Sequence, residues 1–203
     1  MKLRPTFLAG VVVLSCGVAA CSGMLDSKQP AERVYWLEPL IVQHAVVTDS
    51  SRPSLVVSVT AAPGLDTDRL LILEPGARLN HYAAARWPDN IPEVLESHLR
   101  TTLESTGRFS RVSSGPASRS MDWALELEVR KLYTLVNARK VQMVLSGYVS
   151  CGAADYAIAM HATAGIDDDR LSEIVAAYQR VLNEVSRQLV VQLAEVCNDM
   201  NAG

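Results

Sequence analysis

The sequence predicts an α+β domain in which an antiparallel sheet carries two main helices on one face, after a signal peptide and a short tether. Three observations lead to this fold class. Residues 123–130 alternate strictly between apolar and polar side chains, as a strand with one wet face does. Residues 171–196 carry an apolar stripe at spacings of three and four, which is typical of a packed helix. A cysteine, Cys21, directly follows an N-terminal apolar run that ends in small residues.

Residues 1–20 contain the basic, apolar and small-residue parts of a secretory signal. The placement of Cys21 resembles a bacterial lipobox, in which the peptidase would cut before Cys21 and the thiol would carry diacylglycerol. The alternatives are a secreted protein with a chance cysteine, and a cut at Cys16, which is the poorer site because a bulky leucine lies two residues before it. The apolar run is too short to span a bilayer stably, since a span needs about 20 residues. By resemblance to sorted lipoproteins, Ser22 permits transfer to the outer membrane.

We expect four segments: a signal peptide (1–20), a lipidated tether (21–32), one periplasmic domain (33–198) and a C-terminal tail (199–203). The length suits one sizeable domain and is short for two. The chain has 19 basic and 22 acidic residues, and loss of the signal removes two of the basic ones. This mildly acidic balance provides no electrostatic footprint for nucleic acid.

The first half of the domain predicts strands and one helix. Residues 34–37 and 54–60 are rich in β-branched or aromatic side chains, and residues 69–73 are a further apolar run that ends at a proline and a glycine. We expect 54–60 and 69–73 to form an early antiparallel unit. A helix should begin after Asp89 or Asn90 and end at a glycine at position 107, with an apolar face at helical spacing. A short strand follows at residues 109–112.

The second half predicts a meander and a closing helix. Residues 123–130, 141–150 and 156–162 alternate in polarity, and a hairpin connection is expected at 137–140. Three aspartates at 167–169 are expected to open the long helix, where negative charge suits the helix dipole. The apolar stripe of this helix is best explained by packing against the core. Val181 and Val190 lie off the main line, which leaves a contact with another subunit, and so a homo-oligomer, open.

Cys151 and Cys197 are the remaining cysteines after Cys21 and Cys16. An oxidising envelope permits a disulfide between them, which would pin the last helix to a strand end. Two buried thiols in the core are the alternative.

The sequence has no phosphate-binding glycine loop, no dinucleotide fingerprint, no zinc-protease motif and no serine-hydrolase elbow. Four histidines are scattered without metal-ligand spacing. We therefore expect no metal, no cofactor and no enzyme activity, although a catalytic triad can assemble from distant positions.

Residues 64–69 (Gly-Leu-Asp-Thr-Asp-Arg) are followed by residues 84–92 (Ala-Ala-Arg-Trp-Pro-Asp-Asn-Ile-Pro). Together they resemble the ABC-type transport auxiliary lipoprotein family (paraquat-inducible C lipoprotein-like). Residues 35–37 and 107–109 also fit the family pattern, and the resemblance covers about residues 33–195. It is weaker after residue 137, and Cys151 and Cys197 depart from it.

The resemblance implies a non-enzymatic auxiliary component of a lipid transport system that combines an ATPase, a permease and an MCE protein spanning the periplasm. The lipoprotein would face the periplasm from the outer membrane and dock the far end of that bridge. Arg86 and Trp87 could take part in docking, since arginine and tryptophan are common interface anchors. Alternatively, Trp87 fills the core and Arg86 pairs with a carboxylate. A lipoprotein that assembles another envelope complex, a lipid-binding carrier and a hydrolytic domain remain alternative functions.

Overall fold

The computed structural model describes residues 31–42, 51–116 and 121–201, with side chains in the last helix described through Val196. Backbone contacts separate residues 1–31 from a folded unit that begins at Glu32. The expected signal peptide, Cys16, Cys21, Ser22 and most of the tether therefore lie outside the described residues.

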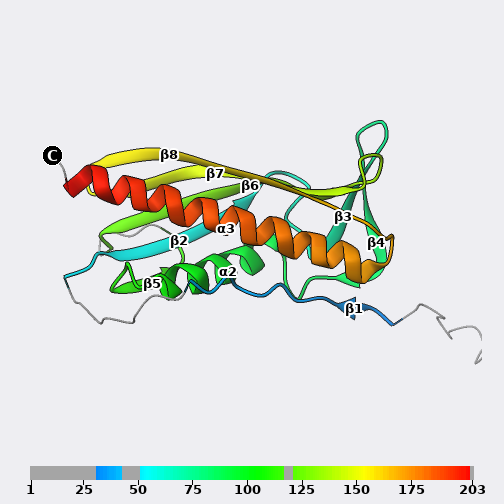
Figure 1. Ribbon diagram of the computed structural model, residues 1–203, viewed down its shortest axis with the longest axis horizontal. Helices are drawn as coiled ribbons and strands as arrows, with labels where there is room; N and C mark the ends of the chain where they lie inside the picture. Colours follow the sequence, from blue (N-terminus) through cyan, green and yellow to red (C-terminus); the bar gives the residue numbers. More distant parts are fainter. Residues whose placement is uncertain (1–30, 43–50, 117–120, 202–203) are drawn as a thin grey trace, which may run out of the picture. The chain divides into compact units, whose positions relative to one another are not determined.

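The described part of the folded unit contains one mixed sheet of eight strands and two helices (Figure 1). The α+β class and the two helices are thus confirmed. The helices are α2 (Ile91–Ser105) and α3 (Leu171–Asn201). The strands are β1 (Arg33–Val34), β2 (Ser54–Ala61), β3 (Arg69–Glu74), β4 (Arg78–Arg86), β5 (Arg111–Ser114), β6 (Trp123–Leu135), β7 (Lys140–Cys151) and β8 (Ala154–Gly165).

The second half of the chain forms the predicted antiparallel meander. β6 pairs with β7, and β7 pairs with β8 along its whole length. The connection between β6 and β7 falls at residues 136–139, where the hairpin was expected, and Arg139 has a positive φ of 44°. Alternate residues of β6 face the core, because successive side chains of a strand point to opposite faces.

The sheet is mixed, whereas an antiparallel sheet was expected. β2 and β3 both pair parallel with β6, β5 pairs parallel with β2, and β1 pairs parallel with β4. β2 and β3 therefore form no antiparallel unit, and the antiparallel partner of β3 is β4. The physical reason is the crossover: after β2 the chain passes through β3, β4 and α2 before it returns as β5, and a long connection that includes a helix can join parallel strands.

The sequence analysis missed β4. Most of its residues are exposed or half-buried, and it has a run of three alanines, so it shows neither clean alternation nor many β-branched side chains. The pairing of β3 with β4 shifts register between Arg69 and Leu71, and Ala84 has a positive φ of 54°. This irregular end of β4 contains Arg86, and Trp87 follows it directly.

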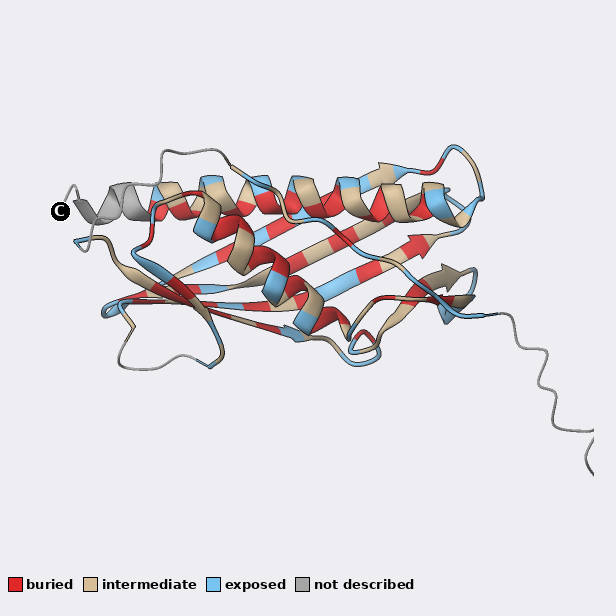
Figure 2. Ribbon diagram, turned by 90° about the horizontal axis from the view of Figure 1, so that it is seen from below, coloured by how far each residue is buried: buried red, intermediate tan, exposed pale blue. Residues whose placement is uncertain are grey.

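Both helices cover the same face of the sheet (Figure 2). α2 packs on β2 and β5, and α3 packs on β7 and β8. The inward side chains form one apolar cluster, while the outward side of β6 is polar. Val181 is fully buried in this cluster, so it is unavailable for the subunit contact that its position off the main stripe suggested. α3 begins at Leu171, two residues after the aspartates that were expected to open it.

Candidate functional site

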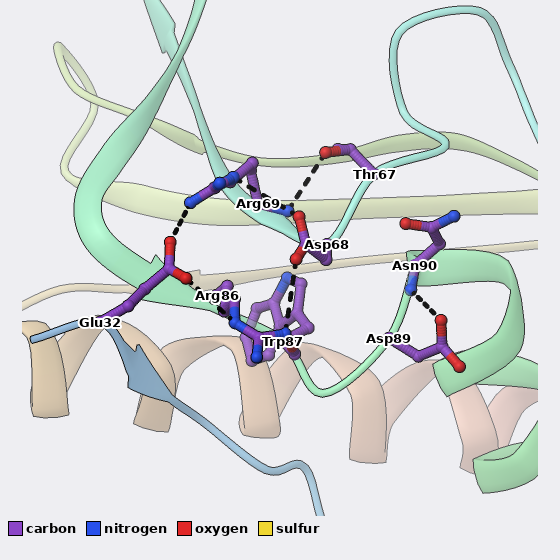
Figure 3. A network of polar contacts seen from close by, with 8 residues as sticks. All are labelled: Glu32, Thr67, Asp68, Arg69, Arg86, Trp87, Asp89 and Asn90. Carbon is purple, nitrogen blue, oxygen red and sulfur yellow. Dashed lines mark hydrogen bonds and ion pairs between the residues drawn. The ribbon is translucent and has the colours of Figure 1, made fainter.

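Four charged side chains meet where β1, β3 and β4 come together (Figure 3). Arg86 places its Nε atom 3.2 Å from Oε2 of Glu32 and a terminal nitrogen 3.6 Å from Oδ2 of Asp68. Arg69 pairs with the other oxygen of Glu32, and its Nε atom lies 3.4 Å from Oδ1 of Asp68. Two carboxylates and two guanidinium groups therefore form a network that is neutral as a whole.

Each of these four side chains is between about a third and two fifths exposed. Ion pairs that are this accessible contribute little to stability individually, about 0–1 kcal/mol, because water and salt screen them. The network thus links three strands without acting as a major source of folding energy. It also leaves part of the Arg86 guanidinium accessible from outside.

Trp87 lies directly below this network and belongs to the core. Its side chain is 1% exposed, and its ring meets the ring of Tyr178 on α3 edge to face, with centroids 5.2 Å apart and planes at 72°. This edge-to-face arrangement is a favourable one for two aromatic rings. The contact joins the end of β4 to α3, so Trp87 has the structural role that the sequence allowed for it.

The second member of the aromatic pair, Tyr178, is also hydrogen-bonded through its hydroxyl group. The hydroxyl of Tyr178 donates to the carbonyl oxygen of Leu71 at 2.9 Å and lies 3.4 Å from the hydroxyl of Thr134. Burial raises the pKa of Tyr178 far above its ordinary value, so the phenol stays protonated and remains a donor. Trp87 and Tyr178 together fix β3, β4 and β6 against α3.

The residues around the network also position the start of α2. The backbone N–H of Trp87 donates to the carbonyl of Asp68 at 2.7 Å, and that of Ile91 donates to the carbonyl of Thr67 at 3.1 Å. Asn90 is the N-cap, and its backbone N–H donates to Oδ1 of Asp89 at 2.9 Å (Figure 3). The two sequence segments that carry the family resemblance are therefore in direct contact with each other.

The structure places Cys151 at the buried end of β7. Cys197 belongs to α3, but its side chain lies outside the described residues. α3 does pack against β7, the strand that carries Cys151. The disulfide between them remains a prediction.

A groove lies beside α2, on residues that the sequence analysis did not select. It has a volume of about 290 Å³ and runs between residues 36–39 and the first half of α2. Trp36, at its edge, is 66% exposed, whereas His98, on α2, is only 3% exposed. Helical periodicity could have placed His98 on the apolar face, three residues after Leu95, but nothing in the sequence brings Trp36 next to it.

Neither ring nitrogen of His98 has a hydrogen-bond partner among the described residues. Burial lowers the pKa of His98 to about 4, so the imidazole is neutral near pH 7. A neutral imidazole has one donor and one acceptor nitrogen, and both are unused here.

Within the described ranges, no group of three or more His, Cys, Asp or Glu side chains is arranged to hold a metal ion. In the same part of the chain, no helix combines the length and the apolar character that crossing a bilayer requires.

The sequence matches the model of a known family. The model of the family described as "ABC-type transport auxiliary lipoprotein component" matches residues 35–190. The matched range runs from the residue after β1 into α3, so it includes Trp87, the groove and three members of the polar network, Asp68, Arg69 and Arg86, but not Glu32. No protein of curated function matches the sequence.

Two solved structures have a similar fold. Protein XCC0632 from Xanthomonas campestris, assigned to the family DUF330, has a TM-score of 0.68 and 17% identity, covering 84% of this chain and all of that one. A crystal structure titled as an uncharacterized protein has a TM-score of 0.66 and 14% identity, covering 81% of this chain and 99% of that one. At these identities the likeness concerns the fold alone.

Proposed function

Because the chain belongs to the family of ABC-type transport auxiliary lipoprotein components, we propose that it is a non-enzymatic outer-membrane lipoprotein that docks a periplasm-spanning MCE protein. The MCE protein would work with a permease and an ATPase to move lipid. The observation that carries the proposal is the family match, which extends over almost the whole folded domain. The same match supports the coarser statement that the protein is an auxiliary lipoprotein of an ABC transport system.

The lipid anchor in this proposal is Cys21. The leader sequence supports it, since small residues precede the cysteine after an apolar run. Metabolic labelling with a fatty-acid probe should tag the wild-type protein and leave Cys21→Ala untagged, and the variant should leave the membrane fraction. Separation of inner and outer membranes then tests the localisation. Equal labelling of both proteins would reject the anchor.

The docking function is tested by co-purification. Cells that produce the tagged protein together with the candidate MCE protein, permease and ATPase are solubilised, and the bound proteins are identified by mass spectrometry. The proposal expects the MCE protein to be retained, and a matched envelope lipoprotein with its own anchor serves as the control. Failure to retain the MCE protein above that control would count against the docking function.

Arg86 separates a docking role from a structural one. Its guanidinium pairs with Glu32 and Asp68 at an accessible site, so Arg86→Ala should lower the free energy of unfolding by only about 1 kcal/mol. Truncation of an interface hot spot typically costs binding more than about 2 kcal/mol. Lost association at nearly unchanged stability supports a docking surface around Arg86. Unchanged association in a stable variant removes Arg86 from that surface.

A further inference from the structure

The segment that forms one wall of the groove beside α2 is fixed by hydrogen bonds at both of its ends. The backbone N–H of Tyr35 donates to the carbonyl of Arg86 at 2.9 Å, and that of Val42 donates to Oγ of Ser105 at 2.9 Å. Between them, the backbone of Glu38 both donates to and accepts from the side-chain amide of Gln179, each at 2.8 Å. Residues 35–42 are thus fixed to α2 and α3, and the groove exists before anything binds in it.

The walls of this groove are mainly apolar and partly uncovered. Trp36 is two-thirds exposed, Val94 is half-buried, and Leu37 is buried beneath them. Two further apolar side chains of the same segment, Val34 and Ile41, are more than half exposed. Exposed apolar surface of this kind, gathered beside a preformed concavity, is typical of a site that binds a partner.

The charges at the groove have one sign. Asp89 and Glu93 line it, both are exposed, and neither forms an ion pair with any residue that the structure describes. Among the described residues, no Lys or Arg side chain lines the groove. An occupant that carries a positive charge next to an apolar group would therefore complement it.

His98 contributes a buried, neutral side chain to the same wall. It is almost wholly buried, it lines the groove, and both of its ring nitrogens lack a partner in the described part of the chain. Buried polar groups in proteins are nearly always hydrogen-bonded, because leaving one unpaired costs about 1–3 kcal/mol. Both nitrogens are covered by protein, so His98 adds a neutral, buried part to this wall and no charge that would offset the carboxylates.

We propose that the groove binds an extended segment of a partner protein that places an apolar side chain against Trp36 and Val94 and a neighbouring Lys or Arg beside Asp89 and Glu93. This proposal rests on the proposed docking function and names the surface and the chemistry of the docked segment. A bilayer is the competing occupant, because the proposed lipid anchor at Cys21 precedes this segment in the sequence. The unpaired carboxylates disfavour it, because they repel anionic headgroups.

The fluorescence of Trp36 can report whether a ligand binds in the groove. The protein has three tryptophans, and Trp87 and Trp123 are buried, so acrylamide should quench mainly the fluorescence of Trp36. The full lipidated protein is anchored in phosphatidylcholine vesicles and titrated with acetyl-Lys-Leu-Leu-Lys-amide or with the matched acidic peptide acetyl-Glu-Leu-Leu-Glu-amide. The basic peptide should protect Trp36 from quenching, and the acidic one should not. Equal protection by both peptides, or none by either, would overturn the proposal.

The variants assign the effect to the groove. Glu93→Lys should weaken binding of the basic peptide about tenfold, because it reverses one of two complementary charges. Glu195→Lys, at an exposed position of α3, is the matched control and should bind like the wild-type protein. Equal effects of Glu93→Lys and Glu195→Lys would show a general charge effect and reject the groove.

A second arm tests the membrane. The same protein is anchored without peptide in vesicles of phosphatidylethanolamine and phosphatidylglycerol, and Trp36 should stay open to acrylamide. Protection there would mean that the groove faces lipid, and it would overturn the proposal.

The failure of this inference can be told apart from failure of the docking function. If the co-purified MCE complex is retained by Trp36→Ala and Glu93→Lys as well as by the wild-type protein, docking stands and the groove is rejected. If no complex forms with the wild-type protein, the docking function is rejected, and the peptide titration still decides whether the groove binds basic apolar segments.

Discussion

Acid should destabilise this fold through His98. The side chain is buried without a hydrogen-bond partner among the described residues, and burial lowers its pKa from 6.5 to about 4. The unfolded chain takes up the proton near pH 6.5, whereas the folded protein takes it up only near pH 4. The stability that neutral His98 contributes is therefore complete above pH 6.5 and is lost as the pH falls toward 4.

The size of this effect follows from the difference between the two pKa values. Each pKa unit corresponds to about 1.4 kcal/mol, so the full loss is about 3 kcal/mol. The carboxylates of Asp89 and Glu93 line the same groove and would partly stabilise an imidazolium, which makes this an upper figure. A loss of this size is a large fraction of the 5–15 kcal/mol that ordinarily holds a domain folded.

The assay is urea unfolding of the wild-type protein and of His98→Leu, from about pH 7.5 down to about pH 4. Other titrating groups act equally in both proteins, so the difference between the two free energies of unfolding isolates His98. This difference should move by about 3 kcal/mol in favour of the variant across the range. A difference that stays constant with pH would refute the reasoning and show that His98 is hydrated or hydrogen-bonded in the folded state.

Three further predictions concern the core. Trp87→Ala should lower the free energy of unfolding by about 3–5 kcal/mol in urea titrations, as loss of a buried aromatic does, and a loss below about 1 kcal/mol would contradict its burial against Tyr178. Gly147→Ala should destabilise the protein by about 1–3 kcal/mol or more, because the new Cβ would lie 1.9 Å from the carbonyl oxygen of Glu126; an unchanged melting temperature would argue against this close approach. Peptide mapping without reductant should find Cys151 joined to Cys197 in envelope-purified protein, and two free thiols would exclude the bridge.

Local patterns in the sequence were enough to predict much of this fold. Alternation along β6, β7 and β8 gave the meander, and the apolar stripe gave α3, because each pattern reflects one element packed on one core. Strand partners were harder to predict. The parallel pairing of β2 with β6 joins residues almost seventy positions apart, and no periodicity in either strand specifies it.

Part of the candidate site could be predicted from the sequence, and part could not. The sequence singled out Arg86 and Trp87 and allowed each a structural role, which the ion pairs and the aromatic contact now describe. The groove could not be found from the sequence, because it exists only where residues 36–39 lie against α2, more than fifty positions further along the chain. Both segments are individually ordinary, and their combination of unpaired charge, exposed indole and buried imidazole arises from tertiary packing.

The position of Glu32 has a mechanical consequence. It is the first residue of the folded unit, and its carboxylate bonds to Arg69 on β3 and Arg86 on β4, next to the short parallel pairing of β1 with β4. If Cys21 is anchored, any pull of the transport complex against the membrane enters the fold at this point. The ion pairs of Glu32 with Arg69 and Arg86 would break first under such a force, and they can re-form readily in water. The core around Trp87 would be strained only after these ion pairs had broken.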